Sequence, residues 1–208
     1  MKKFFFVTLF LLLISSTSFC MSAASYAVDD NFREELYKVV EGVRNYFGID
    51  AEFFYDEDNP RVNATSSSTG EIHLFGGLVE KAYSVPNSPW TYIILVIAHE
   101  WAHQQQFLYG YRPMYNIQKE LQADCEGAYF LFTIYKVTQE EITNLINNQM
   151  SNPIRSLPWW DVKAHGTRQQ RIAAVKRGYD LASHAISINR MYTPSEIFNF
   201  CEYIMVTP

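Results

Sequence analysis

Apolar residues recur at helical spacing through most of the chain and form strand-like runs only in its first third. A first helix is predicted from Asp29 to Gly48, because acidic residues suit the first turn of a helix and glycine suits its end. Three short strands are predicted at residues 49–55, 61–65 and 71–75, in short runs bounded by turn residues. The sheet is therefore expected to be small.

The remainder of the chain predicts helices with recognisable start and stop signals. A short helical piece follows Gly76, and a central helix has Ser88 as its N-cap, Pro89 in its first position and Gly110 at its end. A second long helix is expected at about residues 116–137. Capping-box spacing opens three further helices, at Thr138–Glu141, Thr167–Gln170 and Thr193–Glu196.

These patterns predict a single α+β domain, mainly helical, over residues 28–208. Residues 147–166, rich in Asn, Pro and Trp, are expected to form a long surface loop. The acidic turn at residues 56–60 is expected to be a solvated loop rather than a calcium site. His73 alternates with apolar neighbours and is expected to be a sheet residue rather than a metal ligand.

Residues 1–27 have the pattern of a secretory signal peptide. Two lysines precede the apolar run at 4–14, and residues 25–27 offer a small-x-small cleavage site. The apolar run is shorter than the roughly 20 residues that span a bilayer. We therefore expect export to the periplasm or the outside, with no membrane span in the mature chain; retention as an uncleaved anchor is the alternative.

Charge and cysteine content bear on the binding partners of the protein and on a possible disulfide. A formal charge of −5 argues against nucleic acid as a partner, since nucleic-acid binding depends on a basic surface. Cys125 and Cys201 would be the only cysteines left after cleavage of the signal peptide. In an oxidising compartment they can form a disulfide, and the sequence leaves the paired and free states open.

The central helix carries an H-E-x-x-H motif at His99, Glu100 and His103. Residues four apart lie on the same face of a helix, so both imidazoles can turn toward one cation. Neutral imidazoles suit zinc, and a glutamate beside them can serve as general base for an activated water. The alternative is a pair of histidines that only pack within a partly buried helix.

Further candidates follow on later helices. Zinc hydrolases use three protein ligands, and Glu120 on the second long helix can supply the third. Asp124, one turn on, can accept a hydrogen bond from a ligating imidazole and fix its tautomer. His165, just before a helix, can stabilise an oxyanion, and Arg171 can orient either acid. The alternatives are solvated acids on an amphipathic helix and an ordinary surface histidine.

Three segments, His99–His103, Glu120–Cys125 and His165–Arg171, together resemble a bacterial family of neutral zinc metallopeptidases. They are also similar to the membrane-embedded gluzincins, among them the CAAX prenyl proteases. The resemblance runs from about residue 63 to residue 179. In the middle of the motif this chain has Trp101-Ala102 where the family often has Gly-His.

The resemblance implies a zincin-like fold in which the motif helix packs on a second helix that carries the third ligand. One zinc ion per chain would be held by His99, His103 and Glu120. A small sheet would bind substrate, with Asn63 and Ala64 in the substrate-binding strand, since a free strand edge can pair with an extended peptide.

The expected activity is that of a zinc metalloendopeptidase acting on a protein or peptide. Two alternatives remain open: a zinc amide hydrolase acting on cell-wall peptides, and a non-catalytic binding domain with structural zinc. A fourth protein ligand would favour the structural site, whereas retention of Glu100 beside the ligands favours catalysis.

Overall fold

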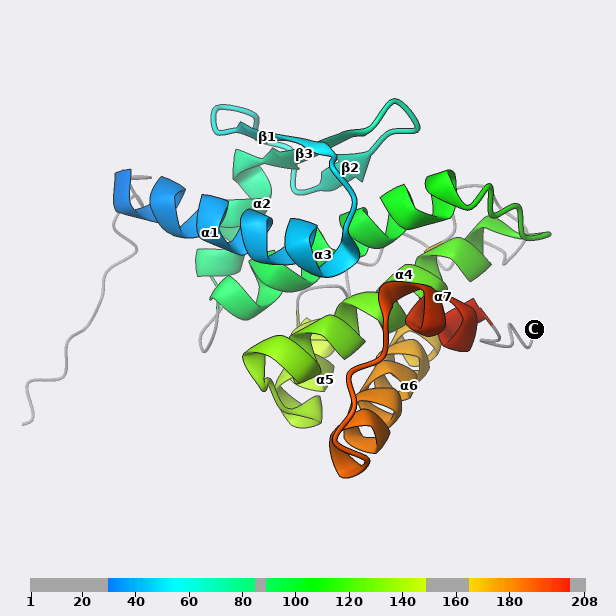
Figure 1. Cartoon of the computed structure of the whole chain (residues 1–208). Helices are drawn as coiled ribbons and strands as arrows, with labels where there is room; N and C mark the ends of the chain where they lie inside the picture. Colours follow the sequence, from blue (N-terminus) through cyan, green and yellow to red (C-terminus); the bar gives the residue numbers. More distant parts are fainter. Residues whose placement is uncertain (1–29, 85–88, 149–164, 203–208) are drawn as a thin grey trace, which may run out of the picture.

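The computed structural model describes residues 30–84, 89–148 and 165–202 (Figure 1). The predicted signal peptide, the N-cap at Ser88 and most of the predicted loop at 147–166 lie outside these residues. The described chain is mainly helical with one three-stranded sheet, which confirms the predicted α+β class. No helix in the described part of the chain is long and apolar enough to cross a membrane.

The elements follow one another along the chain as α1 (Asp30–Phe47), β1 (Glu52–Asp56), β2 (Ala64–Ser66), β3 (Glu71–Phe75), α2 (Gly76–Tyr83), α3 (Pro89–Leu108), α4 (Asn116–Phe130), η1 (Leu131–Tyr135), α5 (Gln139–Asn148), α6 (Arg168–Ser187) and α7 (Pro194–Glu202). The sheet has the order β1-β3-β2. β3 pairs with β1 in parallel and with β2 antiparallel. Because β3 is the middle strand, both of its edges are paired, and the outer edges of β1 and β2 have no strand partner in the described chain. Of these two edge strands, β2 packs against α3.

Helix α3 is the centre of the molecule. It packs against α1, α2, β2 and β3 on one side and against α4 on the other. Figure 1 shows the sheet at the top and α4, α6 and α7 below, with α3 between them. Contact on several sides explains why Ile93–Ala98 is apolar all around the helix rather than along one stripe.

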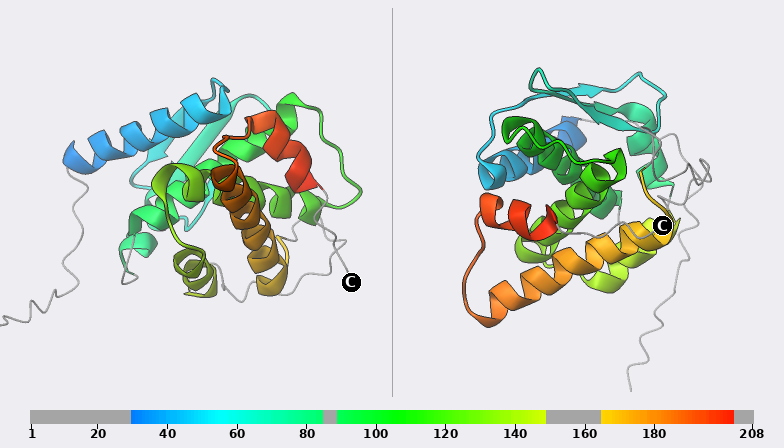
Figure 2. Two further views of the ribbon diagram at one scale, coloured as in Figure 1. Left: turned by 60° about the horizontal axis from the view of Figure 1, so that its bottom comes forward. Right: turned by 90° about the vertical axis from the view of Figure 1, so that its right-hand side faces the viewer.

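The second layer of helices is built on α4, which packs against α3, α6 and α7. Figure 2 shows α6 as a long helix on the side away from the sheet. Gly178 of α6 allows this close approach, because a Cβ there would lie 2.3 Å from the carbonyl oxygen of Cys125. Cys125 on α4 forms a disulfide with Cys201 on α7, with a Cα–Cα distance of 5.8 Å.

Local sequence signals account for most helix ends. The three capping boxes predicted at Thr138, Thr167 and Thr193 are confirmed, since each threonine side chain accepts a hydrogen bond from the amide three residues on. Gly48 ends α1 with a φ of 64°, as a C-terminal glycine can.

The predicted helix at 116–137 is wrong in its last third, after residue 130. Regular α-helix ends at Phe130, and Leu131–Tyr135 forms a π-helical turn. The hydroxyl of Thr133 donates to the carbonyl oxygens of Tyr129 and Phe130, which competes with the α-helical pattern. Lys136, with a φ of 58°, then ends the segment.

The predicted strand bounds also need correction. The strand expected at 61–65 is Ala64–Ser66, so Asn63 lies just before it, and the one expected at 49–55 is Glu52–Asp56. Pairing with β3 sets the length of both strands, because only the residues in register with β3 are bonded to it.

Candidate metal site

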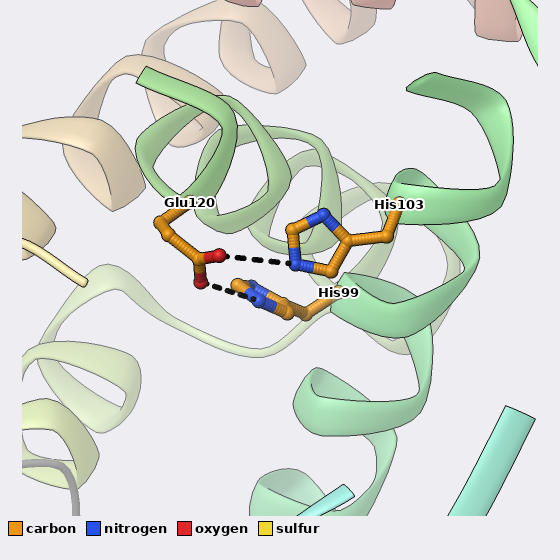
Figure 3. A group of neighbouring side chains, drawn as sticks. All are labelled: His99, His103 and Glu120. Carbon is orange, nitrogen blue, oxygen red and sulfur yellow. Dashed lines mark ion pairs between the residues drawn. The ribbon is translucent and has the colours of Figure 1, made fainter. Parts of the chain in front are cut away.

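Two packed helices bring three metal-ligating side chains to one point. His99 and His103 lie one turn apart on α3, and Glu120 faces them from α4 (Figure 3). The Nε2 atom of His99 is 3.4 Å from Oε2 of Glu120, and Nε2 of His103 is 3.6 Å from Oε1. One ligand atom from each side chain lies within 4.8 Å of the other two, so this group can hold a metal ion.

Both imidazoles are turned so that Nε2 faces the cluster and Nδ1 faces a protein acceptor. Nδ1 of His99 is 3.0 Å from Oδ1 of Asp124, and Nδ1 of His103 is 2.9 Å from Oε1 of Gln106. With the hydrogen on Nδ1, each Nε2 keeps its lone pair for a cation. The donor set is thus two imidazole nitrogens and one carboxylate, a combination that suits zinc and related divalent ions.

Asp124 is held from two sides. Arg171 on α6 donates two hydrogen bonds of 2.6 Å to its carboxylate, while His99 donates a third. Asp124 is 1% exposed, so its charge needs these partners. Burial opposes its ionisation, but the charge and hydrogen bonds of Arg171 and the bond from His99 lower its pKa.

The electrostatics of the cluster favour opposite charges on its two sides. Burial alone would lower the pKa of His99, but hydrogen bonds to Asp124 and Glu120 raise it to about 10. Burial also opposes ionisation of Glu120, yet the neighbouring side chains of His103, His165 and His99 bring its pKa well below the usual value. In the metal-free protein a proton on His99 therefore occupies the place where a cation would bind, and cation and proton compete.

Glu100 lies beside the cluster on α3 and is 7% exposed. Burial raises the pKa of its carboxyl group, and the nearby His99 and His103 work in the opposite direction. A buried carboxyl group next to a cation site, but outside the group of ligands, has the surroundings of a general base.

His165 reaches the cluster from the segment before α6, and its side chain is 66% exposed. Its Nδ1 is 2.7 Å from Oε2 of Glu120. That hydrogen bond raises the pKa of His165, against the effect of burial. The side chain therefore contacts the third ligand directly, and it lies on the solvent side of the cluster.

Two other residues singled out from the sequence lie toward the sheet. Ala64 begins β2 with its side chain buried, and Asn63 is exposed just before it. β2 is tied to the motif helix because the amide of Gln104, next to His103, donates to the hydroxyl of Ser66 at 2.6 Å.

Trp101, the departure in the middle of the motif, is completely buried. Its ring stacks on Phe53 of β1 with centroids 6.1 Å apart, and its indole nitrogen donates to the carbonyl of Ile49. It therefore points into the sheet side of the core.

Gln106 is the contact that the sequence interpretation missed. The signal was present: three consecutive glutamines, Gln104–Gln106, follow His103 on a helix that is otherwise buried. Uncharged amides in such a place need hydrogen-bond partners, and two of the three have them.

No family model, curated protein or solved structure matches this chain, so the geometry of the cluster carries the functional argument.

Proposed function

We propose that this protein is a zinc-dependent metallopeptidase of zincin-like fold, with His99, His103 and Glu120 as ligands and Glu100 as general base. One observation carries the proposal. Two imidazoles with Nε2 turned inward and a facing carboxylate lie beside a second, buried carboxyl group, that of Glu100, which is not one of the ligands. A structural metal site has no use for that last group.

The bound zinc would supply Lewis acidity, which polarises a carbonyl group and makes water more acidic. Glu100 accepts a proton from the attacking water as the new bond to the carbonyl carbon forms. It then returns that proton to the amine nitrogen as the C–N bond breaks. His165, on the solvent side of Glu120, donates a hydrogen bond to the oxyanion after turning from its present partner.

The remaining parts of the proposal concern substrate and location. The substrate is an extended peptide that passes along the outer edge of β2, near Asn63 and Ala64. Export to the periplasm or the outside is supported by the disulfide between Cys125 and Cys201, because disulfides persist in oxidising compartments.

The test measures zinc content and hydrolysis of unfolded protein by the purified chain and by Glu100→Gln. The variant is expected to keep its zinc and to lose hydrolysis by 10²-fold or more, since general-base catalysis contributes about 10²–10⁴-fold. Glu126→Gln is the matched control, because it makes the same change in another buried glutamate, on α4, that lies outside the group of ligands. It should retain both zinc and activity.

Undiminished cleavage by Glu100→Gln would refute the general-base role. A wild-type protein that binds no zinc would refute the metal site itself. Digestion of purified cell-wall material in preference to unfolded protein would instead assign the same chemistry to wall peptides. Zinc without any hydrolysis, in a site closed by a fourth protein ligand, would leave a structural role.

A further inference from the structure

We propose that the side-chain amides of Gln106 and Gln122 form a relay that positions His103 and is anchored on the C-terminal helix α7. The relay goes beyond the proposed function, because it assigns roles to residues that touch neither substrate nor metal. Its first readout, the tautomer of one imidazole, does not depend on any activity.

The relay consists of consecutive short hydrogen bonds. Oε1 of Gln106 lies 2.9 Å from Nδ1 of His103, and Nε2 of Gln106 lies 2.8 Å from the carbonyl oxygen of Lys119. The same Nε2 lies 3.0 Å from Oε1 of Gln122. Nε2 of Gln122 in turn donates to the carbonyl oxygen of Phe198 on α7 at 3.0 Å. Both amides are buried, so water does not compete for these bonds.

Two main-chain carbonyl groups fix the direction of every bond in the relay. The carbonyl oxygen of Phe198 can only accept, so the nitrogen of Gln122 must face it and the oxygen of Gln122 must face Gln106. The carbonyl oxygen of Lys119 likewise requires the nitrogen of Gln106. The oxygen of Gln106 is then left for His103, which must carry its hydrogen on Nδ1. The Nε2 lone pair is thereby directed at the cluster.

The far end of the relay is anchored covalently. Cys125 lies three residues after Gln122 on α4, and Cys201 lies three residues after Phe198 on α7. The disulfide therefore joins the same two helices one turn from the last hydrogen bond of the relay. The position of α7, which is remote in sequence from the motif helix, thus helps to orient His103 through Gln122 and Gln106.

A neutral amide suits this position for an electrostatic reason. His99 is already oriented by the carboxylate of Asp124, and Glu100 and Glu120 place two further carboxyl groups around the cluster. A second acid behind His103 would add another negative charge in a buried place, where like charges are costly. An amide fixes the tautomer without adding charge.

Gln105 provides an internal comparison on the same helix. It is 1% exposed, as buried as its neighbour, yet neither atom of its amide has a hydrogen-bond partner within the described residues. Gln105→Met therefore removes a buried amide next to Gln106 without touching the relay. It is the matched control for Gln106→Met and Gln122→Met.

The first measurement is the ring ¹⁵N spectrum of the metal-free protein at pH 8, with wild type and the three variants compared. Wild type and Gln105→Met are expected to show His103 with its hydrogen on Nδ1. Gln106→Met should give a mixture of tautomers, and Gln122→Met a smaller change in the same direction, because Lys119 still holds Gln106. A wild-type His103 with its hydrogen on Nε2 would overturn the relay.

The second measurement is the zinc dissociation constant from competition with a chelator. Gln106→Met is expected to weaken binding by about 10–100-fold, as loss of a partner behind a ligating histidine does. Binding by Gln106→Met within twofold of Gln105→Met would also overturn the proposal. If wild type binds no zinc, the proposed function fails, but the tautomer measurement still decides the relay.

Discussion

Glu126 is a buried acid whose ionisation should weaken the folded state. It lies on α4 with 1% of its surface exposed, and neither carboxyl oxygen has a hydrogen-bond partner among the described residues. Burial raises its pKa well above the usual value, and the nearby His99 opposes this shift. The folded protein therefore holds a proton on Glu126 at pH values where the unfolded chain, with an ordinary glutamate pKa of about 4.3, has released it.

The sign of the pH dependence follows from linkage. Because the folded pKa lies above the unfolded one, stability is lost as the pH rises from the unfolded pKa through the folded pKa. The loss is about 1.4 kcal/mol for each pH unit over which only the folded state keeps the proton. Glu126→Gln has nearly the same shape and no proton to release. Its free energy of unfolding should exceed that of wild type by an amount that grows at this rate.

The assay is urea unfolding of wild type and Glu126→Gln at several pH values between 4.5 and 7.5, with a chelator present so that metal binding does not contribute. The exposed Glu140, replaced in the same way, is the control and should change stability by less than about 0.5 kcal/mol at every pH. A difference between wild type and Glu126→Gln that is constant with pH, or a variant that is less stable throughout, would refute the reasoning.

Two further predictions concern the packing of α6 and α7 on α4. Replacing both Cys125 and Cys201 by alanine should lower the free energy of unfolding by up to about 4.5 kcal/mol, the loop-entropy value for cysteines 76 residues apart. An unchanged denaturation midpoint under oxidising conditions would argue against this prediction. Gly178→Ala should cost about 1–3 kcal/mol, because the new Cβ would lie 2.3 Å from the carbonyl oxygen of Cys125. Gly42→Ala on α1 should instead stabilise the protein by up to about 1 kcal/mol, because the nearest atom to the new Cβ would lie 3.7 Å away. Equal effects of the two substitutions in thermal unfolding would contradict the packing argument.

Local signals in the sequence determined most of the secondary structure. The capping boxes at Thr138, Thr167 and Thr193 start helices where threonine and the residue three positions on predicted them, because both partners lie within one turn. The same locality placed His99 and His103 on one face of a helix, since four residues make about one turn. The π-helical turn at Leu131–Tyr135 was not predicted from periodicity, although the hydroxyl bonds of Thr133 in it reach back only three and four residues.

Tertiary structure alone decided what faces the two histidines. The spacing of Glu120 and Asp124 placed both on one face of α4, but only the packing of α4 on α3 brings Glu120 within 3.4 Å of His99. Arg171 arrives from α6, which lies close enough because Gly178 has no side chain. These distances depend on how whole helices pack, and no pattern within a short window of the chain encodes them.

The same distinction applies to the orientation of the ligands. The sequence provided glutamines after His103, but which of them would hold the imidazole depended on the carbonyl groups of Lys119 and Phe198. A main-chain carbonyl is present at every position, so its direction is invisible in the sequence and is fixed only when α4 and α7 take their places. The residue types set which chemistry is possible, and the packing of the helices sets which atoms meet.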